Sequence, residues 1–358
     1  MIICSLVHDN FAYRELEIKI IPRERLLVSD NLPGRLHSAD AISLDDAELY
    51  ARLAALDEAA EQIDTRTANT KRNYAGDWRT WQTYTAQTGI PPMAATPGSL
   101  TGFVLWLAQR GDAPATIQRR LYGATVMLRE QGVTVPDEAP RKARDVLNAL
   151  ARNLAEQGEK RGRGQAPAVT VQQLRKMSAA LPHTLKGLRD RAILTVGFGM
   201  AARRSELAGL LVRDVVLLDE GLKVHVRYGK TGGRAPAIKR GTHPLTCPVT
   251  AWQAWVEAVE LEAASPAFRR IDRHGNVLGK MSPQAVGNVV TDAAELASLD
   301  GITAHSLRSG LATEARRAGH DAKTIAEQGG WSPTSGVLYG YMRTVDEWAD
   351  NATAGLGL

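Results

Sequence analysis

The feature that most constrains the fold is a helical period in residues 51–157, where apolar side chains return every three or four positions. This spacing places them on one face of an α-helix. Gly111, Gly132 and Gly158 each follow an apolar series and are typical helix stops. The four predicted apolar faces are Tyr74, Trp78 and Trp81; Leu100, Phe103, Val104 and Leu107; Ile117, Leu121, Ala124 and Leu128; and Leu147, Leu150 and Leu154. The sequence therefore predicts an all-α bundle over residues 51–158, with the aromatic residues in its core.

Two further segments flank this bundle. Residues 1–50 are assigned as an N-terminal arm, either flexible or an over-extended start of translation, because 1–44 show no clear period. We assign the arm no function. Residues 159–167, EKRGRGQAP, are basic, polar and rich in glycine, which is typical of a linker between domains. A basic linker can also lie along a phosphate backbone.

The second predicted domain, residues 168–358, mixes two periods. Asp190–Leu210 is a long apolar stretch that predicts helix, and we expect Gly197 and Gly199 to break it in two. An apolar run at 215–218, a turn at 219–221 and the alternation of apolar and polar residues at 222–226 then predict two short strands, with a possible third at 235–238. Ser282–Pro283 is a typical helix start after the sheet. The fold class is therefore mainly α with two domains, the second an α+β domain with a small antiparallel sheet.

The charge of the chain is slightly positive, with 44 Lys+Arg against 39 Asp+Glu and a net charge of +5. Its distribution is more informative than its sum. Acidic residues concentrate at 45–61, and basic residues at 141–163 and 189–240. Basic faces of this kind suit a polyanion, although charge alone fits solvated helix faces equally well.

Several classes of protein are disfavoured by composition. Cys4 and Cys247 are too few for a disulfide framework or a cysteine metal site. The opening MIICSLVHDN lacks the basic flank and cleavage pattern of a signal peptide. No run approaches the roughly 20 apolar residues of a membrane span. We expect a soluble, cytoplasmic protein with no membrane partner and no metal.

Five short segments carry the residues that could do chemistry. They are ARRSEL at 202–207, YGKTGG at 228–233, HSLRSG at 305–310, GGW at 329–331 and YGYMR at 339–343. Each is weak alone, because a single His-x-x-Arg arises easily by chance and a tyrosine on a late helix is more often a packing residue. Their order, residue types and predicted secondary structure together are far more specific.

In that order the segments resemble the motifs of the tyrosine recombinase family, the phage-integrase type that includes Cre-like and Xer-like enzymes. The matching residues are Arg203 with Glu206, Lys230, His305 with Arg308, Trp331 after two glycines, and Tyr341. The resemblance extends to the helical unit with its NTKRNYAGDW opening and spans about residues 60–350. It implies a SAM-like core-binding bundle and a catalytic domain that close around duplex DNA. It also implies strand cleavage and rejoining through a 3′-phosphotyrosine, without ATP, metal or other cofactor, by a homo-tetramer on two sites.

The residue types suit this chemistry on physical grounds. Attack on a phosphodiester puts negative charge on the non-bridging oxygens, and two guanidinium groups, Arg203 and Arg308, can bind that charge. His305 lies one helical turn before Arg308, so both project from about the same face and His305 can take the phenol proton. Lys230, on a hairpin tip, can protonate the leaving 5′-oxygen. We expect Trp331 to donate its indole N–H to a phosphate oxygen and Glu206 to orient Arg203.

The nucleophile has two candidates. Tyr339 lies 8 positions and Tyr341 lies 10 positions after Trp331, whereas the family spacing is commonly nine. Two residues on a helix are about 200° apart, so only one tyrosine can face the site. We choose Tyr341 because Tyr-Met-Arg resembles the family's ending, with a one-residue insertion at 332–336 explaining the offset.

Other basic residues are candidate contacts to the DNA backbone. These DNA-binding candidates are Arg119 and Arg120 on the third predicted helix, Arg161 and Arg163 in the linker, and Arg204. Arg204 points about 100° away from Arg203 if both are helical. Each of these arginines could equally be an ordinary surface charge.

Two rival functions fit parts of the pattern. A type IB topoisomerase uses a similar pocket to relax DNA, and a recombinase-like clamp without catalysis would only occupy a DNA site. The complete set of reactive residues argues against the clamp, and the helical unit and the tail argue against the topoisomerase. The tail, residues 344–358, is expected to dock Trp348 either on a neighbouring protomer or on its own domain.

Overall fold

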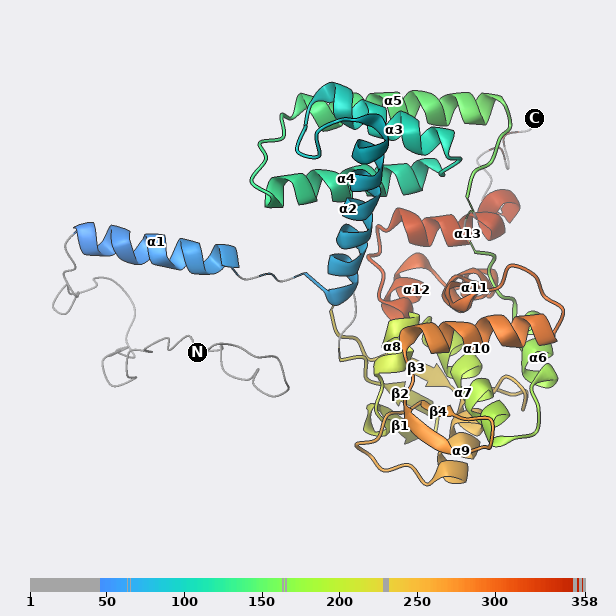
Figure 1. Cartoon of the computed structure of the whole chain (residues 1–358). Coiled ribbons are helices and arrows are strands. Elements are labelled where there is room, and N and C mark those ends of the chain that lie inside the picture. The colour runs from blue at the N-terminus through green and yellow to red at the C-terminus, as the bar shows by residue number, and fades with distance from the viewer. Residues whose placement is uncertain are drawn as a thin grey trace. The chain divides into compact units, whose positions relative to one another are not determined.

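The computed structural model describes residues 46–62, 64, 66–162, 164, 166–227, 232–349, 353 and 356. The chain divides into two compact units, Met1–Gly76 and Asp77–Leu358. The first unit contains helix α1, Asp46–Gln62 (Figure 1). This helix carries three exposed leucines, Leu49, Leu53 and Leu56. The predicted arm boundary at residue 50 therefore falls inside a helix. The part of the arm before residue 46 lies outside the described residues.

Four helices form the bundle that the apolar period predicts. They are α2, Ala68–Thr88, α3, Pro97–Gln109, α4, Pro114–Glu130, and α5, Glu138–Glu156. Thr96 begins α3 by accepting a hydrogen bond from the Ser99 backbone N–H, and Pro114 occupies the first turn of α4. Gly111 and Gly132 follow α3 and α4 with positive φ angles, which glycine adopts without strain.

The aromatic face of α2 differs from the predicted one. Trp81 is fully buried, packs edge-on against Phe103 with 5.2 Å between ring centroids, and donates from Nε1 to the Pro92 carbonyl. The aromatic line continues down the helix to buried Tyr84. Trp78 is partly buried against the same core, but Tyr74 is only half-buried and belongs to the first unit. The core is therefore set one turn further along α2 than the prediction.

The α+β part combines eight helices with two small sheets among the described residues (Figure 1). The helices are α6, Val171–Ala180, α7, Leu185–Gly199, α8, Arg204–Gly209, α9, Pro248–Val259, α10, Pro283–Leu296, α11, Ala304–Arg317, α12, Ala322–Gly329, and α13, Gly336–Ala349. The first sheet has the order β1-β2-β3, with β1, Val215–Leu218, β2, Gly221–Val224, and β3, Ala237–Lys239. Its pairing is antiparallel, with Val215 opposite Val224 and Leu222 opposite Ile238. The predicted fold class is confirmed.

Two local predictions were wrong or incomplete. The stretch Asp190–Leu210 is broken in two as predicted, because α7 ends at Gly199 and α8 begins at Arg204. Gly197, however, lies inside α7, and a Cβ added there would lie 3.1 Å from Leu207 Cδ1 and 3.3 Å from Leu307 Cδ1. A single glycine costs a helix only about 1 kcal/mol, and close packing can offset that cost. The second sheet, β4, Arg269–Ile271, paired with β5, Val277–Lys280, was not predicted.

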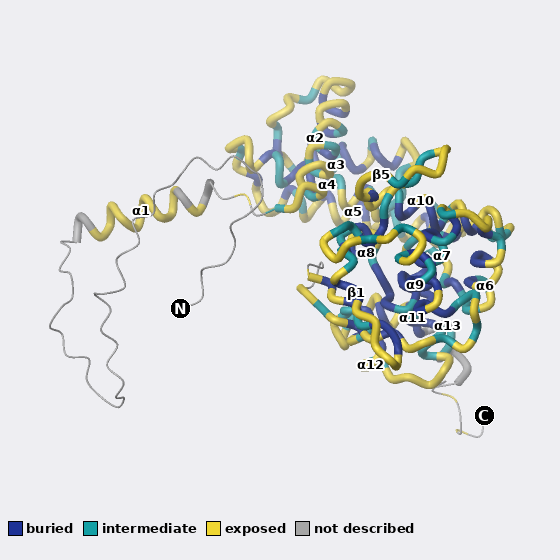
Figure 2. The backbone as a smooth tube through the Cα atoms, turned by 90° about the horizontal axis from the view of Figure 1, so that it is seen from below, coloured by how far each residue is buried: buried dark blue, intermediate teal, exposed yellow. Residues whose placement is uncertain are grey.

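The cores explain how the helices are held. Helix α7 is buried along most of its length, shown in dark blue in Figure 2, and it packs against α9 and α11. A smaller apolar cluster joins α11, α12 and α13 through Ala312, Ile325, Ala326, Leu338, Tyr341 and Met342. None of the described helices is both long enough and apolar enough to cross a lipid bilayer.

Candidate active site

Arg203 lies at the start of α8, whereas the sequence predicts it inside a helix. It is the N-cap residue with extended backbone angles, φ −82° and ψ 146°, and Arg204 is the first helical residue. The Glu206 carboxylate accepts the Arg203 backbone N–H at 3.0 Å and its Nη1 at 2.6 Å. Glu206 thus caps the helix and holds the arginine side chain with the same group, as its predicted orienting role requires.

Arg234 also binds Glu206, and sequence reasoning missed it. Its Nη2 donates to Glu206 Oε2 at 2.7 Å, and its Nη1 donates to the Gln328 carbonyl at 2.6 Å. Burial of Glu206 raises its pKa, but hydrogen bonds and charges from Arg203 and Arg234 outweigh burial, so the pKa is lowered. Glu206 is therefore an anion near neutral pH. No local signal in the sequence could identify Arg234, because both partners are distant along the chain.

Arg308 is the buried cation of the site. Only 2% of the residue is exposed, and its Nη1 donates to the carbonyls of Ala201 and Gly329, both at 2.6 Å. Its Nη2 is buried and has no hydrogen-bond partner among the described residues. Burial and the nearby charge of Arg203 lower the pKa of Arg308 to about 9. A buried cation with an unused donor stands to gain from an anion that reaches it.

Trp331 covers this guanidinium. The ring centroid lies 3.7 Å from Arg308 Cζ, a cation–π contact. The indole also crosses Gly329, where an added Cβ would lie 1.8 Å from the ring atom Cζ3. Only a glycine at position 329 allows this approach. The two glycines before Trp331 thus have different reasons. Gly329 leaves room for the indole, and Gly330, with φ 65°, ends α12 in the left-handed region.

Tyr341 and His305 meet at the edge of this group. The Tyr341 hydroxyl lies 2.5 Å from His305 Nε2, and the tyrosine is only 5% exposed. Tyr341 also packs against Trp331 at 6.1 Å between ring centroids. Tyr339, by contrast, is 52% exposed. The structure therefore brings Tyr341, and not Tyr339, beside the histidine.

The surroundings of His305 favour its neutral form. Burial lowers its pKa, and the positive charges of Arg308 and Arg203 lower it further. A neutral imidazole at pH 7 can accept a proton from a phenol. His305 and Arg203 line one hollow of about 560 Å³ between α8, α10 and the start of α11. Arg204 lies at the same hollow, where its Nη1 donates to Gln284.

Lys230 lies outside the described residues, as does Arg163. The chain is described on both sides of residues 228–231, where Val226 and Arg234 pair as an antiparallel bridge. The side chain of Trp348 and most of the tail after residue 349 also lie outside the described part. The roles expected of these residues stay predictions.

The remaining predicted DNA contacts are all engaged in ion pairs. Arg119 Nη1 binds buried Asp77 at 2.6 Å while its side chain stays 49% exposed, and Arg120 binds Asp112 at 2.6 Å. In the linker, Arg161 binds Glu159 and donates to the Ala108 carbonyl. Arg119 therefore has a structural role in the bundle, and its exposed part can still reach a phosphate.

This arrangement can bind a phosphodiester and supply a nucleophile to it. Two guanidinium groups, a base and a phenol converge, and Arg308 keeps a donor unused. Among the described residues, no group of three or more His, Cys, Asp or Glu side chains is placed to hold a metal ion.

Comparison with known proteins supports this chemistry. The phage integrase family matches residues 167–347, just over half of the chain. The integrase/recombinase xerD homolog of Selenomonas ruminantium is 28% identical over 272 residues, covering 74% of this chain and 78% of the relative. The recombinase cre of Escherichia phage P1 is 24% identical over 297 residues, covering 75% and 81%.

Two solved structures share the fold. A lambda integrase dimer bound to a core site has a TM-score of 0.53 at 15% identity, covering 82% of this chain and 94% of that chain. The Tn1549 transposon integrase in complex with circular intermediate DNA has a TM-score of 0.54 at 15% identity, covering 82% and 93%.

Proposed function

Because this chain belongs to the phage integrase family, we propose that it is a site-specific DNA recombinase that cleaves and rejoins strands through a phosphotyrosine at Tyr341. The observation that carries this residue assignment is the pairing of the Tyr341 hydroxyl with His305 next to a buried arginine whose Nη2 is unused. A backbone phosphate supplies the anion that this arginine lacks. The resulting contact would be a charge-assisted hydrogen bond.

The cleavage step follows from these positions. The Tyr341 oxygen attacks the phosphorus, and its proton passes to His305 Nε2, which lies 2.5 Å away. A phosphorus–tyrosine bond forms while the bond from phosphorus to the 5′-oxygen breaks, and Lys230 gives a proton to that oxygen. Arg203 and Arg308 bind the non-bridging oxygens, where negative charge grows. Trp331 keeps Arg308 in place through the face of its ring, and its indole N–H would donate to a phosphate oxygen.

Rejoining is the reverse of this step. A 5′-hydroxyl from the same or another duplex attacks the 3′-phosphotyrosine and releases Tyr341. The phosphotyrosyl link keeps the free energy of the broken bond, so the chemistry as proposed requires neither ATP nor another cofactor. Exchange between two duplexes then gives integration, excision or resolution.

The partners follow from the same proposal. Double-stranded DNA would lie between the helical bundle, residues 51–158, and the catalytic domain, residues 168–358, with the linker 159–167 along the backbone. Arg119, Arg120, Arg161, Arg163 and Arg204 would contact phosphates. A solved lambda integrase tetramer sits on a Holliday junction, and we propose a homo-tetramer on two sites here. The cytoplasm is the proposed location.

Covalent trapping tests the proposal. A nicked duplex library, in which cleavage releases a short strand that cannot religate, should trap the wild-type protein on DNA in denaturing gels. Tyr341→Phe should trap none, and Tyr339→Phe should trap as much as wild type. The assignment fails if these two variants exchange their results. Supercoiled plasmid separates the rival enzyme, because relaxation of any sequence by a monomer, without exchange between matched sites, identifies a topoisomerase.

A further inference from the structure

We propose that Arg234 is a positioning residue that fixes both phosphate-binding arginines with one side chain. The inference rests on the proposed function of Arg203 and Arg308. It concerns a residue outside the five motif segments that the sequence singled out.

The backbone of Arg234 is itself fixed. Its N–H donates to the Val226 carbonyl at 3.0 Å, and its carbonyl accepts the Val226 N–H at 2.8 Å. These two bonds close the base of the hairpin next to β2 and β3. The side chain is 10% exposed and so extends inward from a rigid point.

One guanidinium joins two segments of the site. Through Nη2 it binds Glu206, the carboxylate that holds Arg203 at 2.6 Å. Through Nη1 it binds the carbonyl of Gln328, the residue before Gly329, whose own carbonyl binds Arg308 at 2.6 Å. A shift of Arg234 would therefore move the supports of both arginines together.

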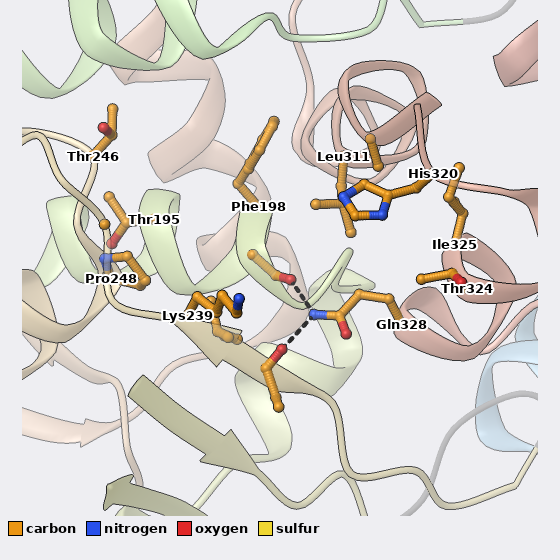
Figure 3. A pocket seen from close by; sticks show the side chains of 15 residues that line it. Thr195, Phe198, Lys239, Thr246, Pro248, Leu311, His320, Thr324, Ile325 and Gln328 are labelled. Atoms are coloured by element: carbon orange, nitrogen blue, oxygen red, sulfur yellow. Dashed lines mark hydrogen bonds between the residues drawn. The ribbon is translucent and has the colours of Figure 1, made fainter. Parts of the chain in front are cut away.

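The second support is braced from the other side. The Gln328 amide Nε2 donates to the carbonyls of Gly199 at 2.7 Å and Ala237 at 2.9 Å, the two dashed bonds of Figure 3. The side chain and the carbonyl of Gln328 thus connect α12 to α7, to β3 and to the hairpin base. Arg234 adds the bond that links this end of α12 to Glu206 and so to Arg203.

An arginine suits this position for two reasons. Its planar fork can donate to two acceptors in fixed directions, which the single ammonium of lysine cannot do. Its charge also stabilises ionised Glu206, whose pKa it lowers. The buried Nε has no hydrogen-bond partner among the described residues, an unfavourable state that the two strong terminal bonds outweigh.

The test compares Arg234→Gln and Arg234→Lys with a control on the same hairpin. Arg227→Gln is that control, because Arg227 Nη2 pairs with Asp214 and with the carbonyl of Gly209, at the end of α8 opposite Arg203. Single-turnover cleavage of the nicked duplex is measured from pH 5 to pH 9, together with the Kd for DNA. We expect Arg234→Gln to cleave about 100-fold more slowly, the usual effect of a misplaced catalytic group, with Kd little changed. Arg234→Lys should restore only part of the rate.

The pH profile separates positioning from general damage. Without Arg234 the pKa of Glu206 rises, so Arg234→Gln should lose more of its rate toward pH 5 than wild type, in addition to the acid limb that protonation of His305 gives to both proteins. Glu206→Gln should lack this additional loss and keep the His305 limb, and the double variant should be no slower than the slower single variant. Cleavage by Arg234→Gln at the rate of Arg227→Gln, the same relative loss of rate at every pH, or multiplicative defects in the double variant would each overturn the proposal.

A second measurement needs no DNA. Urea unfolding of wild type, Arg234→Gln, Glu206→Gln and the double variant reads the Arg234–Glu206 interaction directly, and we expect the two single effects not to add. Additive effects would overturn the bridge even if Arg234→Gln cleaves slowly. Failure of wild type to trap DNA, with non-additive unfolding, would instead refute the proposed function and retain the bridge.

Discussion

Replacing Gly329 with alanine should displace the Trp331 indole and slow DNA cleavage. The added Cβ would lie 1.8 Å from Cζ3 and 2.2 Å from Cε3 of the indole. Normal contact between carbon atoms is about 3.5 Å, so the ring or the end of α12 must move by about 1.7 Å. That movement separates the ring from Arg308, which now lies 3.7 Å from the ring centroid.

The size of the effect follows from the contact that is lost. A desolvated cation–π pair contributes about 2 kcal/mol, which corresponds to a rate loss of about 30-fold if the whole term acts in the transition state. Overpacking also lowers the free energy of unfolding by about 1–3 kcal/mol, which lowers Tm by several degrees. Single-turnover cleavage of the nicked duplex measures the first effect, and thermal melting measures the second.

Gly340→Ala is the matched control. Gly340 lies inside α13, next to Tyr341, but an added Cβ there meets nothing within 4 Å. This variant should cleave like wild type and be more stable by about 0.5–1 kcal/mol, because alanine favours helix. A second variant, Gly329→Ala with Trp331→His, puts a smaller ring over the new methyl and should recover part of the loss in stability. If Gly329→Ala cleaves and melts like Gly340→Ala, the packing argument is refuted.

Two further predictions concern charge. Arg119→Ala leaves buried Asp77 without its cation and should cost about 2 kcal/mol at pH 8, a buried-pair loss reduced because Arg119 is half exposed. Burial raises the pKa of Asp77 and Arg119 opposes this rise, so the pKa of Asp77 is higher still in Arg119→Ala. As pH falls, Asp77 is protonated and no longer needs a cation, so the difference in Tm from wild type should be smaller at pH 5 than at pH 8. An equal defect at both pH values would contradict this. Burial, Arg308 and Arg203 lower the pKa of His305, so the fall of wild-type cleavage toward acid pH should have its midpoint below the ordinary histidine value of about 6.5. A fall that begins above pH 7 would show that the imidazole is not held neutral.

Much of the fold was predictable because its signals are local. Helical period, capping residues, the apolar run of β1 and the alternation of β2 act over a few positions, so the bundle and the first sheet follow from the sequence. The second sheet was missed because β4, RRI, and β5, VLGK, contain few apolar residues and no side chain that is fully buried. Gly197 was misread because its neighbours in space, Leu207 and Leu307, lie on other helices.

The site divides in the same way. His305 and Arg308 are one helical turn apart, and Arg203 and Glu206 are three residues apart, so each pair can be read from spacing. Arg234 could not be read in this way, since its partners are 28 and 94 positions away in the chain. Its role depends on how the hairpin packs on α12, which only the folded chain specifies.

The anchoring of Arg308 has a consequence for how such a protein tolerates change. Both acceptors of its Nη1 are main-chain oxygens, at Ala201 and Gly329. A point mutation cannot remove a peptide oxygen, so these two hydrogen bonds are lost only if the backbone at Ala201 or Gly329 changes conformation. The damaging substitutions are therefore those that disturb the backbone there, because Ala201 holds φ at 48° and Gly329 lies against the Trp331 indole. Related sequences can vary the other side chains around this arginine and still hold it, provided that the turn, the glycine and the bond from Arg234 to the end of α12 persist.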